Sequence, residues 1–240
     1  MKKPLIFFLL IMIASQLQAQ SDGTHLAKDS SNIPTKKMDE RYISFRHVVV
    51  PSTFVVYGFL RNAIQPIENL DVSNRNTIVA HNPGFHSSVD NYLQWAPTTS
   101  LLIMDAAGMK MEHPFKQQML LHLMSLSAMG GSVLIIKKLT NQYRPDSSAQ
   151  NTFPSGHTAT AFVGAEMVHQ ELKHTHPVLS YSGYVFATAT GIYRMYNNKH
   201  WLSDVIAGAG FGILSTKASY WIFEKVNSKK RQKKNLSAVM

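Results

Sequence analysis

Apolar residues recur with helical spacing along most of the chain. Between about residues 41 and 226, long stretches rich in Ala, Leu, Met and Ser are separated by Pro or polar turns, a pattern typical of packed helices. It predicts helices near residues 42–63, 89–109, 114–139, 156–173, 178–195 and 200–226. No stretch alternates apolar and polar residues for long enough to indicate a substantial sheet. We therefore expect an all-α fold, a single bundle of about six helices.

The first residues follow the three-part pattern of a secretory signal. Two lysines precede an apolar run, Leu5–Ile13, which is shorter than the about 20 residues that span a bilayer. A polar patch with small residues then ends at Ala19. We expect a signal peptide at 1–19, a polar linker at 20–40, and export to the periplasmic side of the cell envelope. An uncleaved membrane anchor is the alternative.

Composition and charge narrow the classes of protein. The chain has 240 residues, a formal net charge of +10, 45% hydrophobic residues and no cysteine. The length suits one domain, and a chain without cysteine forms neither disulfides nor Cys-ligated metal sites. Six of the 24 basic residues lie between Lys225 and Lys234, so we expect a basic tail at 227–240, either a solvated end or a tether to anionic lipid. No aromatic residues interleave with these charges, so no nucleic acid partner is expected.

The predicted third helix raises the question of a membrane. Its segment Gln117–Ile136 is free of charge for 20 residues, about 30 Å as a helix, but contains His122, three serines and two glycines. The mean hydropathy of the whole chain, −0.10, is low for a polytopic protein. These features favour a helical domain that contacts a membrane, and leave an integral membrane protein open.

Three clusters of basic, histidine and polar residues lie between residues 137 and 204. In the first, Lys137 is followed seven positions later by Arg144, which precedes Pro145. Seven positions make nearly two helical turns, so the two cations are expected on one helical face. Arginine offers a planar fork that suits phosphate oxygens. Taken alone, this spacing also fits an ordinary wet helix surface.

The second cluster, Pro154–Thr158, precedes an apolar helical run. Helix starts expose unpaired backbone N–H groups and attract anions. Gly156 permits close approach of a ligand to the backbone, the Ser155 hydroxyl can donate a hydrogen bond, and His157 can exchange a proton near neutral pH. A simple helix N-cap is the alternative for Ser155.

The third cluster is Arg194, His200 and Asp204. His200 and Asp204 are four residues apart, so they are neighbours if both lie on one helix. The carboxylate can then accept the Nδ1–H of His200, which leaves Nε2 as a nucleophile or base. A plain surface pair is the alternative.

In this order, Lys-x6-Arg-Pro, Pro-Ser-Gly-His and Arg-x5-His-x3-Asp resemble the signature of the type 2 phosphatidic acid phosphatase / vanadium-dependent haloperoxidase superfamily. The matched segment, 137–204, lies in the C-terminal half of the chain. One position departs from the pattern: the family commonly has Ser before the third-motif Arg, where this chain has Tyr193.

The resemblance implies a role for each matched residue. Phosphate oxygens would be bound by cations and helix-start groups: Lys137, Arg144, Ser155, Gly156 and Arg194. His200 would attack phosphorus to form a phosphohistidine, Asp204 would orient it, and His157 would protonate the leaving alcohol. Three cations suit the charge of a phosphoryl-transfer transition state without a metal, so no cofactor is expected, and the active site is expected at helix ends.

Several alternatives stay open beside a phosphatase of envelope lipids. A soluble periplasmic acid phosphatase, a vanadium haloperoxidase and a non-catalytic phospholipid binder share the motifs. Glu166 and His169 have the spacing of di-iron bundles, but those need two such pairs. Gly208, Gly210 and Gly212 are expected in close helix packing and not in a nucleotide loop.

The expected domain is a helical phosphatase at 41–226 with its motif core at 137–204. Its partner would be a phosphorylated lipid or a small phosphomonoester, with contact to a membrane surface. The motif residues are expected to contact only the phosphate group, so they do not identify the rest of the substrate. No feature of the sequence indicates an oligomeric state.

Overall fold

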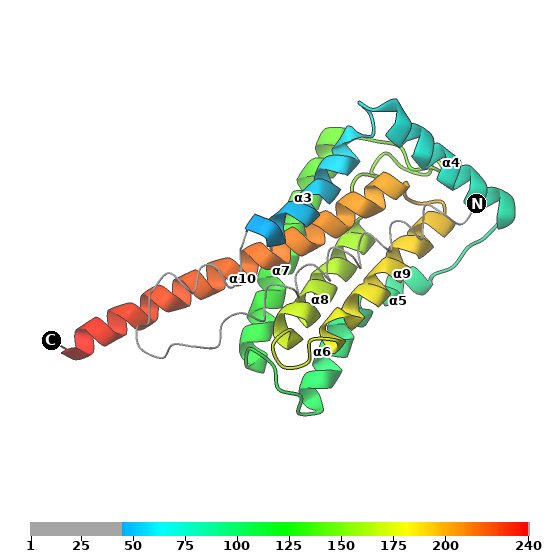
Figure 1. Ribbon diagram of the computed structural model, residues 1–240. Helices are drawn as coiled ribbons and strands as arrows, with labels where there is room; N and C mark the ends of the chain where they lie inside the picture. The colour runs from blue at the N-terminus through cyan, green and yellow to red at the C-terminus, as the bar shows by residue number, and fades with distance from the viewer. Residues whose placement is uncertain (1–44, 240) are drawn as a thin grey trace. The chain divides into compact units, whose positions relative to one another are not determined.

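The structure is a computed structural model that describes the backbone of residues 45–239 and the side chains of residues 47–230. The predicted signal peptide and linker lie outside the described residues. The described part contains eight α-helices, one short 3-10 helix and no strand (Figure 1). The elements are α3 (Phe45–Leu60), α4 (Gln65–His81), α5 (Val89–Leu93), α6 (Ala96–Ala106), α7 (Phe115–Thr140), α8 (Gly156–Leu172), η3 (Leu179–Tyr181), α9 (Ser182–Tyr196) and α10 (Leu202–Val239). The predicted all-α fold is confirmed.

Three elements differ from the sequence prediction. Helix α4 lies in a mostly polar stretch where no helix was predicted. The helix predicted at 89–109 is two helices, α5 and α6, because Pro97 stands in the first turn of α6 and a new helix begins there. Helix α10 continues to Val239, through residues predicted as a basic tail.

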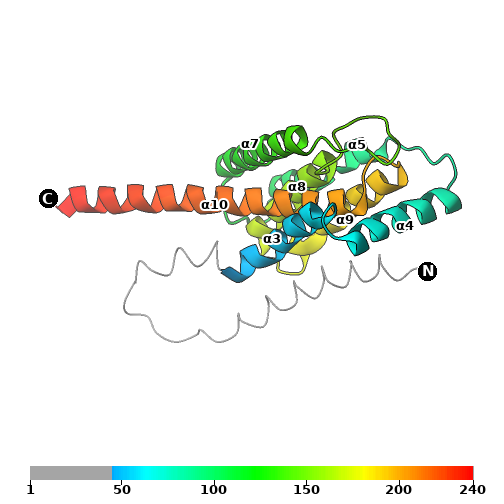
Figure 2. The same ribbon diagram turned by 90° about the horizontal axis from the view of Figure 1, so that it is seen from above.

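Helix α8 is the centre of the bundle and contacts α6, α7, α9 and α10. Figure 1 shows these four helices around it, and Figure 2 shows α7, α9 and α10 beside it in the turned view. Its side chains are buried along almost the whole helix. Val163 and Met167 of α8 pack in one apolar core with Leu101 of α6, Leu121 of α7 and Tyr220 of α10. Because α8 packs against four helices along most of its length, the position of its first turn is fixed by the bundle.

Glycines let α10 pass close to the neighbouring backbones. A Cβ added at Gly208 would lie 2.6 Å from the carbonyl oxygen of Ser155, and one at Gly212 would lie 2.5 Å from that of Ala159. At Gly210 it would lie 2.6 Å from the carbonyl oxygen of Pro51 in α3. The expected packing role of these glycines is confirmed.

The start of α10 is anchored by α4. Asp71 of α4 is fully buried; it accepts hydrogen bonds from the backbone N–H of Ser203, at 2.9 Å, and from the Ser203 hydroxyl. Arg61 lies on the same carboxylate, with Nε 2.8 Å from Oδ2. A carboxylate here satisfies an N–H group that a helix start leaves without an intrahelical partner. Helix α4 therefore fixes the segment that carries the third sequence motif.

Candidate active site

The loop between α7 and α8 brings the two cations of the first motif together. Helix α7 ends at Thr140, so Lys137 and Arg144 do not share a helical face, and that expectation was wrong. Both instead reach Asn151: Lys137 Nζ donates to its carbonyl oxygen, and Arg144 Nε donates to its Oδ1 at 3.0 Å. Lys137 Nζ also lies 3.3 Å from the carbonyl oxygen of Thr152. The loop itself, and not the helix, gathers the cations.

His200 and Asp204 meet around a threonine that the sequence analysis did not single out. His200 precedes α10 and Asp204 lies in its first turn, with His200 Nδ1 3.4 Å from Asp204 Oδ2. That separation is long for a hydrogen bond. The Thr152 hydroxyl lies 3.2 Å from His200 Nδ1 and donates to Asp204 Oδ2. Asp204 Oδ2 also accepts from the Trp201 N–H at 2.9 Å, so the carboxylate and the threonine together orient the imidazole.

The second motif starts α8 at this same end. Ser155 is the N-cap: its side chain accepts from the Thr158 N–H, and its own N–H donates to the Asp204 carbonyl oxygen at 3.0 Å. Its hydroxyl lies 2.9 Å from the Thr158 hydroxyl, as the N-cap alternative expected, and its part in phosphate binding stays a prediction. A Cβ on Gly156 would meet no other atom within 4 Å, so packing alone does not require glycine there.

Arg194 and His157 are held by α5, a segment that the sequence did not mark as functional. Arg194 Nη1 lies 2.6 Å from Asp90 Oδ2, and both side chains are buried. Arg194 Nε is buried with no hydrogen-bond partner among the described residues. His157 Nε2 lies 2.9 Å from Asn91 Oδ1.

The pKa values of both imidazoles are lowered by burial and by nearby cationic side chains. Burial, together with the smaller effect of the Arg194 and Lys137 charges, lowers the pKa of His200 to about 4, although Asp204 acts in the opposite direction. Burial, together with the charges of Arg194, Arg144 and Lys137, also lowers the pKa of His157 to about 4, although Asp90 acts in the opposite direction. Both rings are therefore neutral at pH 7 in the free protein, in a positive field that favours a bound anion.

The departure from the family pattern, Tyr193, lies beside the loop between α4 and α5. Its ring packs against Phe85 with centroids 6.2 Å apart. Among the described residues, the Tyr193 side chain makes no hydrogen bond to the side chains of Lys137, Arg144 or Arg194.

The candidate metal pair of α8 forms a buried ion-pair network. Glu166 Oε1 lies 2.6 Å from Lys217 Nζ and 2.6 Å from Gln170 Nε2, and its Oε2 accepts from the Tyr184 hydroxyl. His169 Nδ1 contacts the Ser180 hydroxyl instead. Within residues 47–230, no group of three or more His, Cys, Asp or Glu side chains is placed to hold a metal ion.

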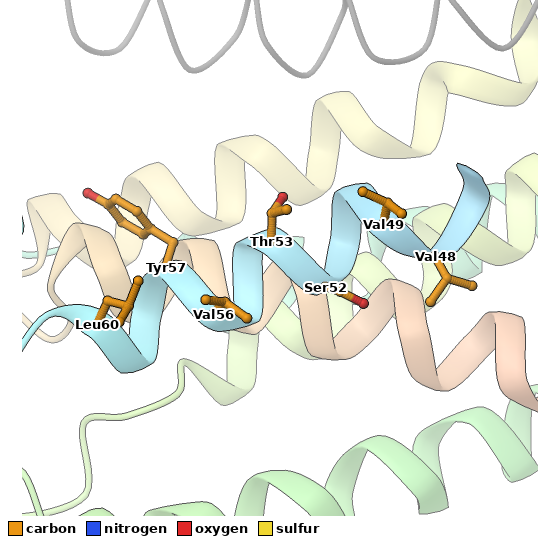
Figure 3. A pocket seen from close by; sticks show the side chains of 7 residues that line it. All are labelled: Val48, Val49, Ser52, Thr53, Val56, Tyr57 and Leu60. Carbon is orange, nitrogen blue, oxygen red and sulfur yellow. The ribbon is translucent and has the colours of Figure 1, made fainter. Parts of the chain in front are cut away.

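Two further surface features lie on α3 and α7. A pocket is lined by seven side chains of α3 between Val48 and Leu60 (Figure 3), none of them a predicted site residue. Helix α7 is the one described helix long and apolar enough to cross a membrane, and 22% of its most apolar window is buried. Large apolar side chains are exposed along it, including Leu123, Leu134 and Leu139.

The comparisons with known proteins agree with the motifs. A Porphyromonas gingivalis lipid A 1-phosphatase is 34% identical over 224 residues, which cover 92% of this chain and 50% of the relative; the chain thus spans about half of that protein. The crystal structure of a transmembrane PAP2 type phosphatidylglycerolphosphate phosphatase from Bacillus subtilis aligns with a TM-score of 0.57 at 20% identity, over 76% of this chain and 98% of that one. The family model of the PAP2 superfamily matches residues 118–228, which include all three motifs. The segment that carries the three motifs, residues 118–228, therefore belongs to the PAP2 superfamily.

Proposed function

We propose that this protein hydrolyses phosphate monoesters or pyrophosphates of envelope lipids through a phosphohistidine intermediate, without a metal. One observation carries the proposal: buried Thr152 joins Lys137 to His200 and Asp204 beside the start of α8. Arg194 and Lys137 act electrostatically on both imidazoles, and Arg144 acts on that of His157. Such a set of fixed cations stabilises the negative charge that spreads over phosphate oxygens during phosphoryl transfer.

In the proposed reaction, His200 Nε2 attacks phosphorus in line while the bond from phosphorus to the leaving oxygen breaks. Thr152 and Asp204 face the other ring nitrogen, Nδ1, and stabilise the ring as it becomes positively charged. His157 gives a proton to the leaving oxygen. A water molecule then gives a proton to His157 and attacks phosphorus while the phosphorus–nitrogen bond breaks, which releases inorganic phosphate and restores both histidines.

The pKa values of the two histidines fit these opposite roles. A pKa of about 4 keeps His200 unprotonated and nucleophilic at neutral pH. For His157, the neighbouring cations oppose protonation, and the negative charge of a bound phosphate offsets them. Substrate binding therefore raises the pKa of His157 and favours the acid form when it is needed.

A phosphorylated lipid is the substrate class that the surroundings favour. The curated relative is named for activity on lipid A. Next to the site, Tyr92 is 78% exposed and Trp95 is 44% exposed on α5 and just after it, and such amphipathic rings suit a membrane–water interface. We place the catalytic domain at residues 41–226, with its motif core at 137–204.

The length of the bundle supports a membrane position with the site outside. His113, just before α7, contacts Glu224 of α10 at 3.0 Å, while Asp204 marks the site end of α10. The 20 residues between them span about 30 Å of helix, the thickness of a hydrocarbon core. The basic residues from Lys225 onward follow directly, and basic segments favour the cytoplasmic face. The site would then face the periplasm, as the predicted signal peptide also indicates.

The test compares phosphate release by the full chain from a water-soluble aryl phosphate and from lipid phosphates in mixed micelles. We expect higher kcat/KM on a lipid phosphate, turnover in EDTA, inhibition by vanadate, and an acid-labile phosphorylated protein after rapid quenching. His200→Ala is the matched inactive variant. Unchanged turnover by His200→Ala would refute the mechanism, and a preference for the aryl phosphate would favour a non-specific acid phosphatase.

A further inference from the structure

Two adjacent side chains of α5 contact two different predicted site residues. Asp90 is 1% exposed; its Oδ2 accepts from Arg194 Nη1 at 2.6 Å, and its Oδ1 accepts from Asn197 Nδ2 at 3.2 Å. Asn91 Oδ1 lies 2.9 Å from His157 Nε2.

We propose that Asp90 and Asn91 are positioning residues of this site: Asp90 aims the guanidinium of Arg194, and Asn91 selects the tautomer and orientation of His157. This inference rests on the proposed phosphatase function, because it assigns what the two contacts do in that reaction.

Hydrogen bonds between the end of α9 and the segment before α5 hold α5 in place beside the candidate site. Asn197, just past the end of α9, donates from Nδ2 to the Ser87 carbonyl oxygen at 2.8 Å, and its Oδ1 accepts from the Ser87 N–H at 2.8 Å. This pair of bonds fixes the chain that leads into α5. Asp90 then occupies Nη1 of Arg194, and the buried Nε keeps no partner among the described residues. A guanidinium anchored on one side offers its remaining donors to a phosphate in a fixed direction.

Asn91 decides which nitrogen of His157 exchanges protons. With Asn91 Oδ1 as the acceptor, Nε2 carries a hydrogen, and the neutral ring is unprotonated at Nδ1. The proton that His157 gives to the leaving oxygen then sits on Nδ1. The other charged groups that act on this ring are Arg194 from α9, Arg144 from the loop, Lys137 from α7 and Asp90 from α5. The three cations lower the pKa of His157, and one carboxylate, Asp90, raises it. The imidazole therefore lies in a net positive field before any change at Asn91.

The decisive experiment replaces Asn91 by a carboxylate. In Asn91→Asp, an opposite charge within hydrogen-bond distance should raise the pKa of His157 by about 1 to 3 pH units. We expect this shift in NMR titration of ¹⁵N-histidine-labelled full chain in detergent micelles, and in the pH limb of kcat that reports protonation of the leaving group. Asn69→Asp is the matched control, because Asn69 is exposed on α4 and adds the same charge away from the site.

Two further variants separate the roles. Asn91→Ala should lower kcat more for an alkyl phosphate than for an aryl phosphate, because a good leaving group needs less protonation. Asp90→Asn should raise KM at least tenfold with a smaller loss of kcat, since a misdirected Arg194 weakens phosphate binding, and Asp90→Glu should recover part of the affinity.

The outcomes distinguish this inference from the proposed function. Wild-type protein without phosphatase activity refutes the proposed function. A titration of His157 that is the same in wild type and Asn91→Asp refutes the inference, whatever the activity. An equal shift in Asn69→Asp also refutes it, because the effect would then be one of net charge.

Discussion

Thr152 joins the parts of the site at the scale of single residues. Its hydroxyl contacts both His200 and Asp204, and its carbonyl oxygen lies 3.3 Å from Lys137 Nζ. One buried residue thus links the cation of α7 to the predicted nucleophile. A hydroxyl between an imidazole and a carboxylate limits the rotation of both groups, so the ring is oriented before substrate binds.

Removal of this hydroxyl should therefore slow the chemistry without unfolding the bundle. Thr152→Val keeps the shape of the side chain and loses a hydrogen bond to a charged group, worth about 1.5–3 kcal/mol. We expect kcat on an aryl phosphate to fall about 10- to 150-fold, at 1.36 kcal/mol per tenfold change in rate. Thr152→Ser, which restores the hydroxyl, should recover most of the rate. Full activity of Thr152→Val would show that Asp204 alone orients His200.

The buried imidazole of His200, as the proposed nucleophile, should set the acid limit of activity. Its pKa is lowered to about 4, so it stays neutral as pH falls from 7 and becomes protonated only near pH 4. The nucleophile is then lost, and kcat/KM should decline with an apparent pKa near 4. Kinetics across pH 3–7 with an aryl phosphate, corrected for ionisation of the substrate, test this. A decline centred near the ordinary histidine value of about 6.5 would contradict the burial of His200.

At the scale of helices, the crossing of α10 over α8 positions one motif against another. The site lies where the start of α10 meets the start of α8, and Gly208 of α10 faces the carbonyl oxygen of Ser155. The closeness of the two backbones therefore affects stability and site geometry together.

Gly208→Ala should separate these helices. The new methyl group would lie 2.6 Å from a backbone oxygen, which has no flexible end to move, so we expect a loss of about 1–3 kcal/mol of unfolding free energy and a matching loss of activity. Gly131→Ala in α7 is the control, because its Cβ would meet nothing within 4 Å and alanine favours a helix interior by up to about 1 kcal/mol. Thermal unfolding and phosphate release measure both variants; equal melting temperatures would contradict the close crossing.

Helix α4 is an element that hydrophobic periodicity along the sequence did not predict. Its sequence is too polar to predict a packed helix, yet Asp71 is buried against Ser203 and Arg61. A buried carboxylate is favourable here only because partners from α10 and the end of α3 surround it. No local pattern carries that information.

At the scale of the whole molecule, the proposed orientation places the site and the basic segment on opposite sides of a membrane. The chain has no cysteine, so single cysteines can report each side. Gln150 lies on the exposed loop at the candidate site. Val226 is 46% exposed and lies in the basic segment of α10, directly after Lys225. Gln150→Cys and Val226→Cys therefore place a cysteine at each.

In intact cells, a membrane-impermeant maleimide should label Gln150→Cys and not Val226→Cys. Permeabilised cells should show labelling of both, and the cysteine-free wild type should show none. The reverse pattern would show that the site faces the cytoplasm. Labelling of both variants in intact cells would show that the two positions lie on the same side of the membrane, which contradicts the proposed orientation.

The sequence by itself determined the all-α class, the residues that make up the three motifs, and the resemblance to the superfamily. Helical periodicity is a local property, and motif spacing records which side chains are present. It also indicated the glycines of α10 as packing positions, because small residues between apolar ones have few other uses in a helix.

Only the tertiary structure decided how the motifs meet. It placed Arg144 beyond the end of α7, inserted Thr152 between His200 and Asp204, and brought Asp90 and Asn91 to Arg194 and His157. Thr152 stands two residues before the second motif, so its position was a usable signal; Asp90 and Asn91 lie more than 60 residues from the side chains they contact. Contacts between residues so distant in the chain depend on how the helices pack, and the spacing of residues along one helix does not encode that packing.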